Sequence, residues 1–479
     1  MAHNRRSYSL TRVCIYVVCI GCCSSLRAFL PVVSRYRPCG SFPFQVPLRP
    51  ASCATGVSRP LNIFSLQAMQ STEVGKIPHG ERESSLEGEE PGNLSESFMW
   101  HWRNGWDVHY ERARNEGAPP LLLLPGFGVG TFHFSRNMNQ LSKIYDVYSM
   151  DLLGQGKSWP SRAPSRQDGL CYSVDTWTDQ VLSFLREVVA RPAYIAGNSL
   201  GGYIGANLAA NHPDTVLGLA LLNATPFWAF REPKRYGSGE SLPTSTTSAS
   251  GRTTPLDEER KDDGGGGGLL RWDGTLPAPK ALFQFGAWYF DRMRDPRTVK
   301  GMLEGVYSNP GAIDDRLVRE IIAATERGPS NHDYGVGGHE AFTSIVFAPK
   351  VAISFETMID RIKAPLVLIY GKEDPWIVPL WGHRIKRQRP DTLYYEISPA
   401  GHCPHHETPS TVNQLLMDWM EHTRSGTPPP LSGEVDALEV KEESGVTAKA
   451  TLIADARPRG PVQWIDSLAW RFSNGGGVS

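Results

Sequence analysis

A serine between two glycines most constrains how this chain can fold. Residues 197–201 read G-N-S-L-G, with Ser199 at the centre. They follow a short strand-like run, residues 193–196, and open an apolar helical segment. The glycines allow a sharp turn between strand and helix, so that the hydroxyl stands clear of the sheet. The alternative is a serine in an ordinary tight turn, but the flanking strand and helix favour a nucleophile.

A serine hydroxyl is a weak nucleophile, so it needs a base, and the base needs an acid to orient it. In a strand–helix fold with such a serine, the acid and the base follow it in the order Asp, His. Asp374 lies in the segment 371–375, which directly follows one apolar strand-like run, and His402 follows the next run by a short loop. We therefore predict a triad of Ser199, Asp374 and His402. Glu373 is the alternative acid, and we interpret it as a solvated neighbour.

Acyl transfer through a serine also needs donors for the oxyanion that forms. The backbone N–H of Leu200, at the start of the helix, is predicted to be one donor. The glycine-rich loop 125–130 follows the apolar run 121–124, and it places the N–H of Phe127 as the second. Losing one such donor typically costs about 10²–10³ in rate. The loop does not have the G-x-G-x-x-G spacing of a dinucleotide site.

Short apolar runs alternate with helical periodicity through residues 95–225 and 364–424. This alternation is typical of an α/β protein with a mostly parallel sheet and helices on both faces. With the serine motif it predicts an α/β-hydrolase fold. Residues 226–363 break the alternation and are mainly helical in pattern, so we expect a lid inserted after the sixth strand.

Two further segments are expected to lack regular structure. Residues 237–268, inside the lid, hold three apolar residues among Ser, Thr, charged residues and five consecutive glycines, so they predict a disordered insertion. Residues 425–479 form a C-terminal extension that we expect to be mostly disordered. Within it, residues 462–472 carry apolar side chains at helical spacing, which would suit docking on the domain or contact with a membrane.

The first 72 residues are typical of a targeting leader. Arginines precede the apolar run 13–20, which is too short to span a bilayer but has the length of a signal-peptide core. An Arg-, Ser- and Pro-rich stretch without acidic residues follows. This order resembles the bipartite leader of proteins sent to complex algal plastids; the alternative is a secretory leader with a disordered spacer. Residues 73–94 are an acidic linker.

Charge and cysteine content exclude several classes of protein. The leader holds eight arginines and no other charged side chain except histidine, so the rest carries 41 basic and 50 acidic residues, a net charge of −9. We therefore expect no nucleic-acid partner. Six of the eight cysteines lie in the leader, which argues against a disulfide scaffold. Cys403 and the histidines near it lack a matching ligand set elsewhere, so we predict no metal and no cofactor.

Several longer motifs resemble the pheophytinases, a family of plastid α/β-hydrolases. The resemblance covers most of residues 96–423 and rests on LPGFGVG (124–130), DLLGQG (151–156), AGNSLGG (196–202), LNATPFW (222–228), GKEDPW (371–376) and EISPAGHCPH (396–405). It implies that Ser199 is the nucleophile, with Asp374 and His402 as partners. The implied reaction is hydrolysis of the phytyl ester of pheophytin, magnesium-free chlorophyll, to a pheophorbide and phytol.

The resemblance also implies a hydrophobic pigment as substrate, a plastid location and compatibility with peripheral contact at the thylakoid membrane. Phe227 and Trp228 are candidate substrate contacts. A chlorophyll dephytylase or another plastid lipid esterase would share the triad, and a non-catalytic ligand-binding protein could use the same scaffold. Haloalkane dehalogenases and epoxide hydrolases need a carboxylate at the position of Ser199, which argues against both. The insertion and the C-terminal extension depart from the family pattern.

Overall fold

The computed structural model describes residues 95–224, 272–326, 338–349, 351, 353–426 and 437–454. The predicted leader, the acidic linker and the insertion 237–268 lie outside these residues. So do Phe227 and Trp228, and the apolar segment 462–472 of the extension. None of the described helices is long and apolar enough to cross a membrane.

The described part of the chain is organised by an eleven-stranded sheet, in which the order is β1-β2-β4-β3-β6-β7-β8-β9-β11-β10 and β5 pairs with β2. The six strands from β4 to β9 in this order pair in parallel, and the outer strands pair antiparallel. The strands are β1 (Ser95–Trp102), β2 (Trp106–Ala113), β3 (Pro120–Leu124), β4 (Asp146–Met150), β5 (Trp159–Pro160), β6 (Ala193–Asn198), β7 (Val216–Leu222), β8 (Leu366–Gly371), β9 (Leu393–Ser398), β10 (Ala437–Lys441) and β11 (Thr447–Leu452).

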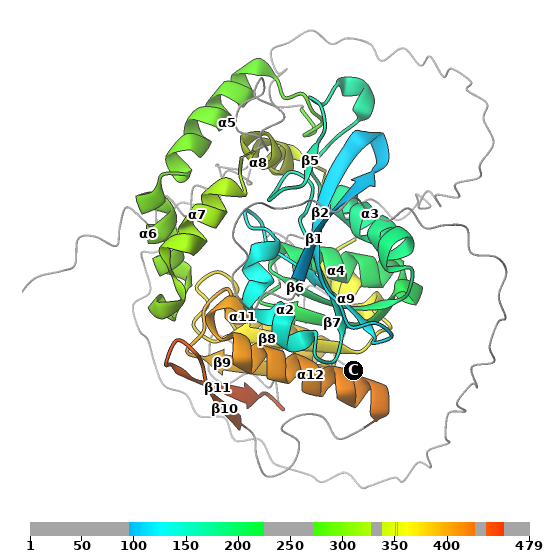
Figure 1. Ribbon diagram of the computed structural model, residues 1–479, viewed down its shortest axis with the longest axis vertical. Coiled ribbons are helices and arrows are strands. Elements are labelled where there is room, and N and C mark those ends of the chain that lie inside the picture. Colours follow the sequence, from blue (N-terminus) through cyan, green and yellow to red (C-terminus); the bar gives the residue numbers. More distant parts are fainter. Residues whose placement is uncertain are drawn as a thin grey trace, which may run out of the picture. The chain divides into compact units, whose positions relative to one another are not determined.

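Helices cover both faces of this sheet (Figure 1). One apolar core joins the sheet to α3 (Val174–Phe184), α4 (Leu200–Asn211), α9 (Phe355–Arg361) and α10 (Leu380–Gln388). The core on the other face joins it to α2 (Ser135–Leu141) and α12 (Pro409–Ser425). The predicted α/β-hydrolase fold, with a mostly parallel sheet between helices, is confirmed.

The central strands are apolar throughout because both of their faces are covered. In β3, Leu122 and Leu124 contribute to one core, while Leu121 and Leu123 contribute to the other. All four side chains are fully buried. Alternate side chains of a strand point to opposite faces, so a strand between two helical layers must be apolar at every position.

Among the described residues, four α-helices lie between β7 and α9: α5 (Lys280–Met293), α6 (Pro296–Val306), α7 (Asp315–Ala323) and α8 (Gly338–Phe347). The two-residue β5 aside, six strands precede them, as predicted for the lid. Helices α6 and α7 form a small apolar cluster that also includes Cys403, and α5 packs against α8. Helix α9 also falls within the expected lid but packs on α4 in the core. The chain therefore returns to the core earlier than residue 363.

A hairpin from the C-terminal extension completes one end of the sheet. Strand β11 pairs antiparallel with β9, and β10 pairs with β11 beside α12 (Figure 1). Ala448 and Ala450 of β11 are fully buried in the core under α12. The expectation of disorder is wrong for these residues, because small side chains on one face of β11 fit beneath that helix.

Candidate active site

Ser199 occupies a strained turn at the carboxyl end of β6. Its φ of 49° and ψ of −115° lie in a region that non-glycine residues rarely adopt. A Cβ atom at Gly201 would lie 2.2 Å from the carbonyl oxygen of Leu124, and one at Gly197 would lie 2.4 Å from the nitrogen of Gly202. Only glycine allows these backbones to approach so closely. The sharp strand-to-helix turn expected from the sequence is present.

The predicted acid and base contact each other. Asp374 follows β8 and His402 follows β9, and Asp374 Oδ2 lies 2.7 Å from His402 Nδ1. Both side chains are buried. The other carboxylate oxygen accepts hydrogen bonds from the N–H groups of Trp376 (2.7 Å) and Ile377 (3.0 Å). The carboxylate is thus fixed from both sides and can hold the imidazole in one tautomer.

Asn223, at the end of β7, adds a further constraint that the sequence analysis missed. Its side-chain amide donates to Asp374 Oδ2 (2.6 Å) and its side-chain carbonyl accepts from the N–H of Gly371 (2.8 Å). Burial raises the pKa of the Asp374 carboxyl, but the adjacent His402 and the neighbouring backbone N–H groups hold it below its ordinary value. Asp374 is therefore an anion beside the imidazole.

Glu373, the alternative acid, does not contact the imidazole. It is exposed, and its carboxylate accepts hydrogen bonds from the hydroxyl of Ser398 (2.6 Å) and the N–H of Ala400 (3.0 Å). Glu373 thus supports the loop that leads to His402, while Asp374 contacts the ring.

The turn that carries Ser199 is bonded directly to the histidine loop. The side-chain amide of Asn198 donates to the carbonyl oxygens of His402 (3.0 Å) and Leu222 (3.0 Å). Ser199 and His402 both lie in the described part of the chain, and their Oγ and Nε2 atoms do not form a hydrogen bond there. Bonds of this kind often tighten only when substrate is bound.

The two predicted oxyanion donors belong to the helix that begins directly after Ser199 and to a loop that passes close to it. Leu200 is the first residue of α4, so its N–H has no partner within the helix. The loop that carries Phe127 passes against the turn, because a Cβ atom at Gly126 would lie 3.6 Å from Ser199 Cβ. Within the described residues, neither Leu200 N–H nor Phe127 N–H donates to an acceptor. Both donors are therefore available to a ligand.

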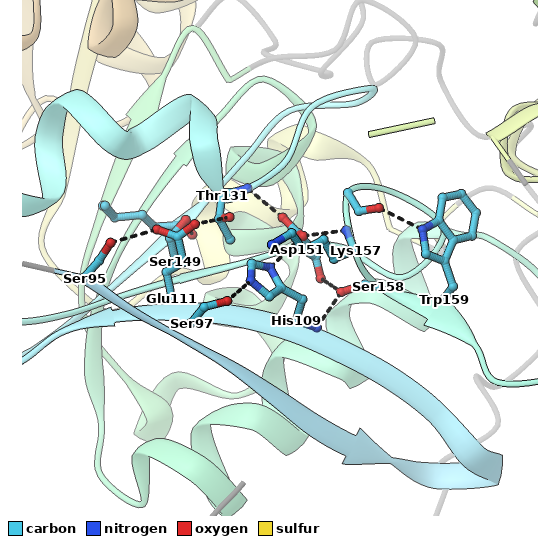
Figure 2. A network of polar contacts seen from close by, with 12 residues as sticks. Ser95, Ser97, His109, Glu111, Thr131, Ser149, Asp151, Lys157, Ser158 and Trp159 are labelled. Carbon is cyan, nitrogen blue, oxygen red and sulfur yellow. Dashed lines mark hydrogen bonds and ion pairs between the residues drawn. The ribbon is translucent and has the colours of Figure 1, made fainter. Parts of the chain in front are cut away.

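A buried polar network around Asp151 holds the Phe127 loop in place (Figure 2). One carboxylate oxygen of Asp151 accepts from the N–H of Thr131 (2.6 Å), just after the loop. The other accepts from the N–H of Lys157 (2.8 Å) and contacts His109 Nδ1 (2.9 Å). The sequence analysis assigned no role to Asp151. The sequence signal was the motif DLLGQG (151–156), and the structure shows why it ends in glycine: a Cβ atom at Gly156 would lie 2.3 Å from the Asp151 carboxylate.

Gln155 contacts the same loop directly. Its side-chain carbonyl oxygen accepts a hydrogen bond from the N–H of Gly128, the residue after Phe127. Gly128 has a φ of 77°, a conformation that favours glycine. The turn 151–156 thus fixes the loop backbone at two points, the N–H groups of Gly128 and Thr131.

Three buried histidines lie behind the His402 loop. His133 Nε2 is 2.9 Å from the hydroxyl of Tyr307, and His133 Nδ1 is 3.2 Å from His405 Nε2. The ring of His406 stacks on that of His133. Burial lowers the pKa of His133 to about 3 and those of His405 and His406 well below the ordinary value. No group of three or more potential metal ligands occurs among the described residues.

Aromatic rings extend from the site to the inserted helices. The ring of Trp376 packs edge-on against that of His402, with centroids 4.9 Å apart. The ring of Phe127 lies 6.2 Å from that of Phe342 on α8, which in turn contacts Tyr289 and Phe290 of α5. Trp376 and Phe342 were not predicted as site residues, although Trp376 ends the motif GKEDPW (371–376).

Residues 121–415 match the alpha/beta hydrolase family. Pheophytinase, chloroplastic, of Arabidopsis thaliana is 34% identical over 435 residues, which cover 85% of this chain and 82% of the relative. The chain is an α/β hydrolase of the pheophytinase family. The order of serine, acid and histidine along the chain agrees with the order expected for this fold.

Two more distant proteins are also similar. The (lyso)-N-acylphosphatidylethanolamine lipase of Homo sapiens is 26% identical over 329 residues, 65% of this chain and 81% of the lipase. Among solved structures, a carboxylesterase from Bacillus subtilis has a TM-score of 0.45 at 17% identity, and covers 68% of this chain and 91% of the esterase.

Proposed function

We propose that this chain is a serine carboxylic-ester hydrolase that removes phytol from pheophytin in chlorophyll breakdown. The observation that carries the proposal is the buried contact between Asp374 and His402 at the edge of the sheet where Ser199 stands in a strained turn. The relationship to a pheophytinase supports the choice of substrate.

In the acylation step, Ser199 Oγ attacks the ester carbonyl carbon of the pigment while His402 Nε2 takes the hydroxyl proton. Asp374 keeps the proton on Nδ1 and stabilises the imidazolium. The N–H groups of Leu200 and Phe127 bind the oxyanion. The tetrahedral intermediate collapses when the bond from the carbonyl carbon to the alcohol oxygen breaks and His402 gives its proton to that oxygen. Phytol leaves, and the acyl group remains on Ser199.

Deacylation repeats these steps with water. His402 takes a proton from a water molecule, whose oxygen attacks the acyl carbon, and the same two N–H groups bind the second oxyanion. The bond to Ser199 Oγ then breaks and His402 returns the proton to Oγ. The products are the pheophorbide carboxylic acid and free enzyme. His402 thus takes and returns every proton in the two steps, and one water molecule is consumed.

The aromatic lining supports a large apolar substrate. A phytyl chain has about twenty carbons, and each buried CH₂ contributes roughly 0.8 kcal/mol, so an apolar lid could supply most of the binding free energy. The ring contacts from Phe127 through Phe342 to Tyr289 offer such a surface. Flat aromatic rings such as Trp376 also suit contact with a tetrapyrrole plane. Phe227 and Trp228 remain predicted substrate contacts.

The Arabidopsis relative is named as chloroplastic, which supports a plastid location for this chain. We infer that the leader 1–72 directs the chain to a complex algal plastid, and that the enzyme contacts the thylakoid membrane peripherally. The exposed side chains of Phe285 and Trp288 on α5 support such contact, since exposed aromatic groups favour the membrane interface.

Separate incubations of the protein with pheophytin a and chlorophyll a, followed by chromatography, test the proposal. We expect pheophorbide a and phytol from pheophytin, and no product with Ser199→Ala, whose fold is checked by circular dichroism. Failure of the wild type to release phytol from either pigment would overturn the proposal. Dephytylation of chlorophyll a in preference would instead identify a chlorophyll dephytylase. A burst with p-nitrophenyl acetate separates an esterase from a pigment-binding protein without turnover.

A further inference from the structure

Glu407 is a buried carboxylate whose hydrogen bonds reach two distant segments. It ends the short helix α11 (Pro404–Glu407), and only 1% of its surface is exposed. Oε1 accepts from the N–H groups of Gly401 (2.9 Å) and Cys403 (3.2 Å), the two residues that flank His402. Oε2 accepts from those of Ser308 (2.6 Å) and Asn309 (3.0 Å), which follow α6 in the lid. One side chain therefore binds the histidine loop and the lid together.

Further contacts join the same two segments. The N–H of His402 donates to the carbonyl oxygen of Val306, the last residue of α6 (2.9 Å). A Cβ atom at Gly401 would lie 2.1 Å from that oxygen, so the close approach requires glycine. The side-chain amide of Asn309 also donates to the backbone oxygen of Glu407 (3.0 Å). The backbone of His402 is thus held by the end of α6.

The negative charge of Glu407 has no cationic partner in the part of the chain that the structure describes. Among the described residues it forms no ion pair with a lysine or arginine, and its four N–H donors carry the whole compensation. Burial raises the pKa of this carboxyl against the opposing effect of those donors. Burying a carboxylate without a counter-ion is unfavourable, so its gain must lie in the arrangement that it enforces.

We propose that Glu407 is a positioning residue that fixes the imidazole of His402 by binding its loop to the lid segment Ser308–Asn309. The proposal rests on the function proposed above for His402. A carboxylate only accepts hydrogen bonds, so it can bind two N–H groups on each oxygen. A glutamine in its place would present an NH₂ group to one pair of donors and release either the lid or the histidine loop. Movement of the lid is thereby coupled to the geometry of the catalytic base.

Glu442, in the turn between β10 and β11, offers a matched control. Its carboxylate is 3% exposed and accepts from the N–H groups of Ser410 (2.9 Å) and Thr411 (3.0 Å) at the start of α12. Like Glu407, it is a buried carboxylate that binds backbone N–H groups, and the hydroxyl of Thr411 also donates to it (2.5 Å). Its donors belong neither to the histidine loop nor to the lid. A general loss of stability would affect both positions alike.

The test compares Glu407→Gln and Glu442→Gln in the full chain, with p-nitrophenyl acetate as a small soluble ester. We expect Glu407→Gln to lower kcat by about 10- to 100-fold with KM unchanged within twofold, since small misplacements of a catalytic group have effects of this size. Glu442→Gln should keep kcat within twofold of the wild type. Equal kcat in the two variants, whether high or low, would overturn the proposal.

Hydrogen exchange tests the same coupling without relying on catalysis. In the wild-type protein the amides of Gly401, Cys403, Ser308 and Asn309 should open with one common free energy, as a single cooperative unit. In Glu407→Gln at least one of the two amide pairs, Gly401 with Cys403 or Ser308 with Asn309, should lose protection from exchange. In Glu442→Gln both pairs should keep it. Independent opening of the two pairs in the wild type would refute the coupling, even if Glu407→Gln fails to fold. An inactive wild type with common opening would instead refute the proposed function alone.

Discussion

The α/β core and the lid bury their side chains to very different extents. In the core, β3 and β8 are buried along their whole length, because helices cover both faces of the sheet. In the lid, the only buried residue of the described helix α5 is Gly286, while Phe285 and Trp288 are 63% and 52% exposed. The core thus provides a rigid edge for the proposed chemistry, and the lid keeps apolar surface available to a substrate or membrane.

The junction between the two regions is polar as well as buried. Glu407 binds backbone N–H groups of both, and Tyr307 of the lid lies within hydrogen-bonding distance of His133. Polar groups buried at such a junction have directional partners, so they specify one arrangement where apolar packing alone would allow several. Substitutions in the core, at the junction and in the lid should therefore have separable effects on activity and stability.

The largest expected effect is on the chemistry at the edge of the core. Asp374→Asn should lower kcat for p-nitrophenyl acetate by about 10⁴-fold, because a neutral amide can hold the imidazole in the wrong tautomer and cannot stabilise the imidazolium. Glu373→Gln is the matched control and should leave kcat within a few-fold, since Glu373 contacts the loop and not the ring. Similar losses in the two variants would show that the structure places the wrong carboxylate beside His402.

The junction should make the protein unstable in acid. His133, His405 and His406 have folded-state pKa values below the ordinary 6.5, because they are buried. The unfolded chain therefore binds more protons, and stability, complete above pH 6.5, falls as the pH drops toward about 3. Each histidine should contribute up to about 1.4 kcal/mol per pH unit in that range. Urea unfolding at pH 7.0 and 5.0 measures this. Equal free energies of unfolding would contradict it.

The smallest effects distinguish packing in the core from packing in the lid. Leu368→Ala, in the centre of β8, should lower the free energy of unfolding by about 2–5 kcal/mol through the cavity that it leaves. Trp288→Ala, on the exposed face of α5, should change it by less than about 0.5 kcal/mol. It should raise KM for pheophytin about fivefold, the equivalent of roughly 1 kcal/mol of lost contact. A destabilisation by Trp288→Ala as large as that by Leu368→Ala would show that α5 belongs to the core.

Features that depend on neighbours in the chain could be predicted. The turn at Ser199 follows from two glycines between a strand and a helix, and the burial of β3 follows from an uninterrupted apolar run. The hydrogen bonds that join separate segments could not be predicted, because their partners are distant in sequence. Glu407 and Asn309 are 98 residues apart, and nothing around either residue indicates the other. The hairpin β10–β11 was missed because the buried face of β11 carries small alanines in place of the large apolar side chains that mark the central strands.

By itself the sequence determined the strand–turn–helix order, the two covered faces of the sheet, and the serine, acid and histidine as candidates. These follow from side-chain periodicity and turn chemistry, which act over a few residues. Only the tertiary structure decided that Asp374 and not Glu373 contacts His402, and that the end of α6 is bonded to the histidine loop. Such contacts depend on where separate backbones meet in space, and hydrogen-bond geometry fixes that to within a fraction of an ångström.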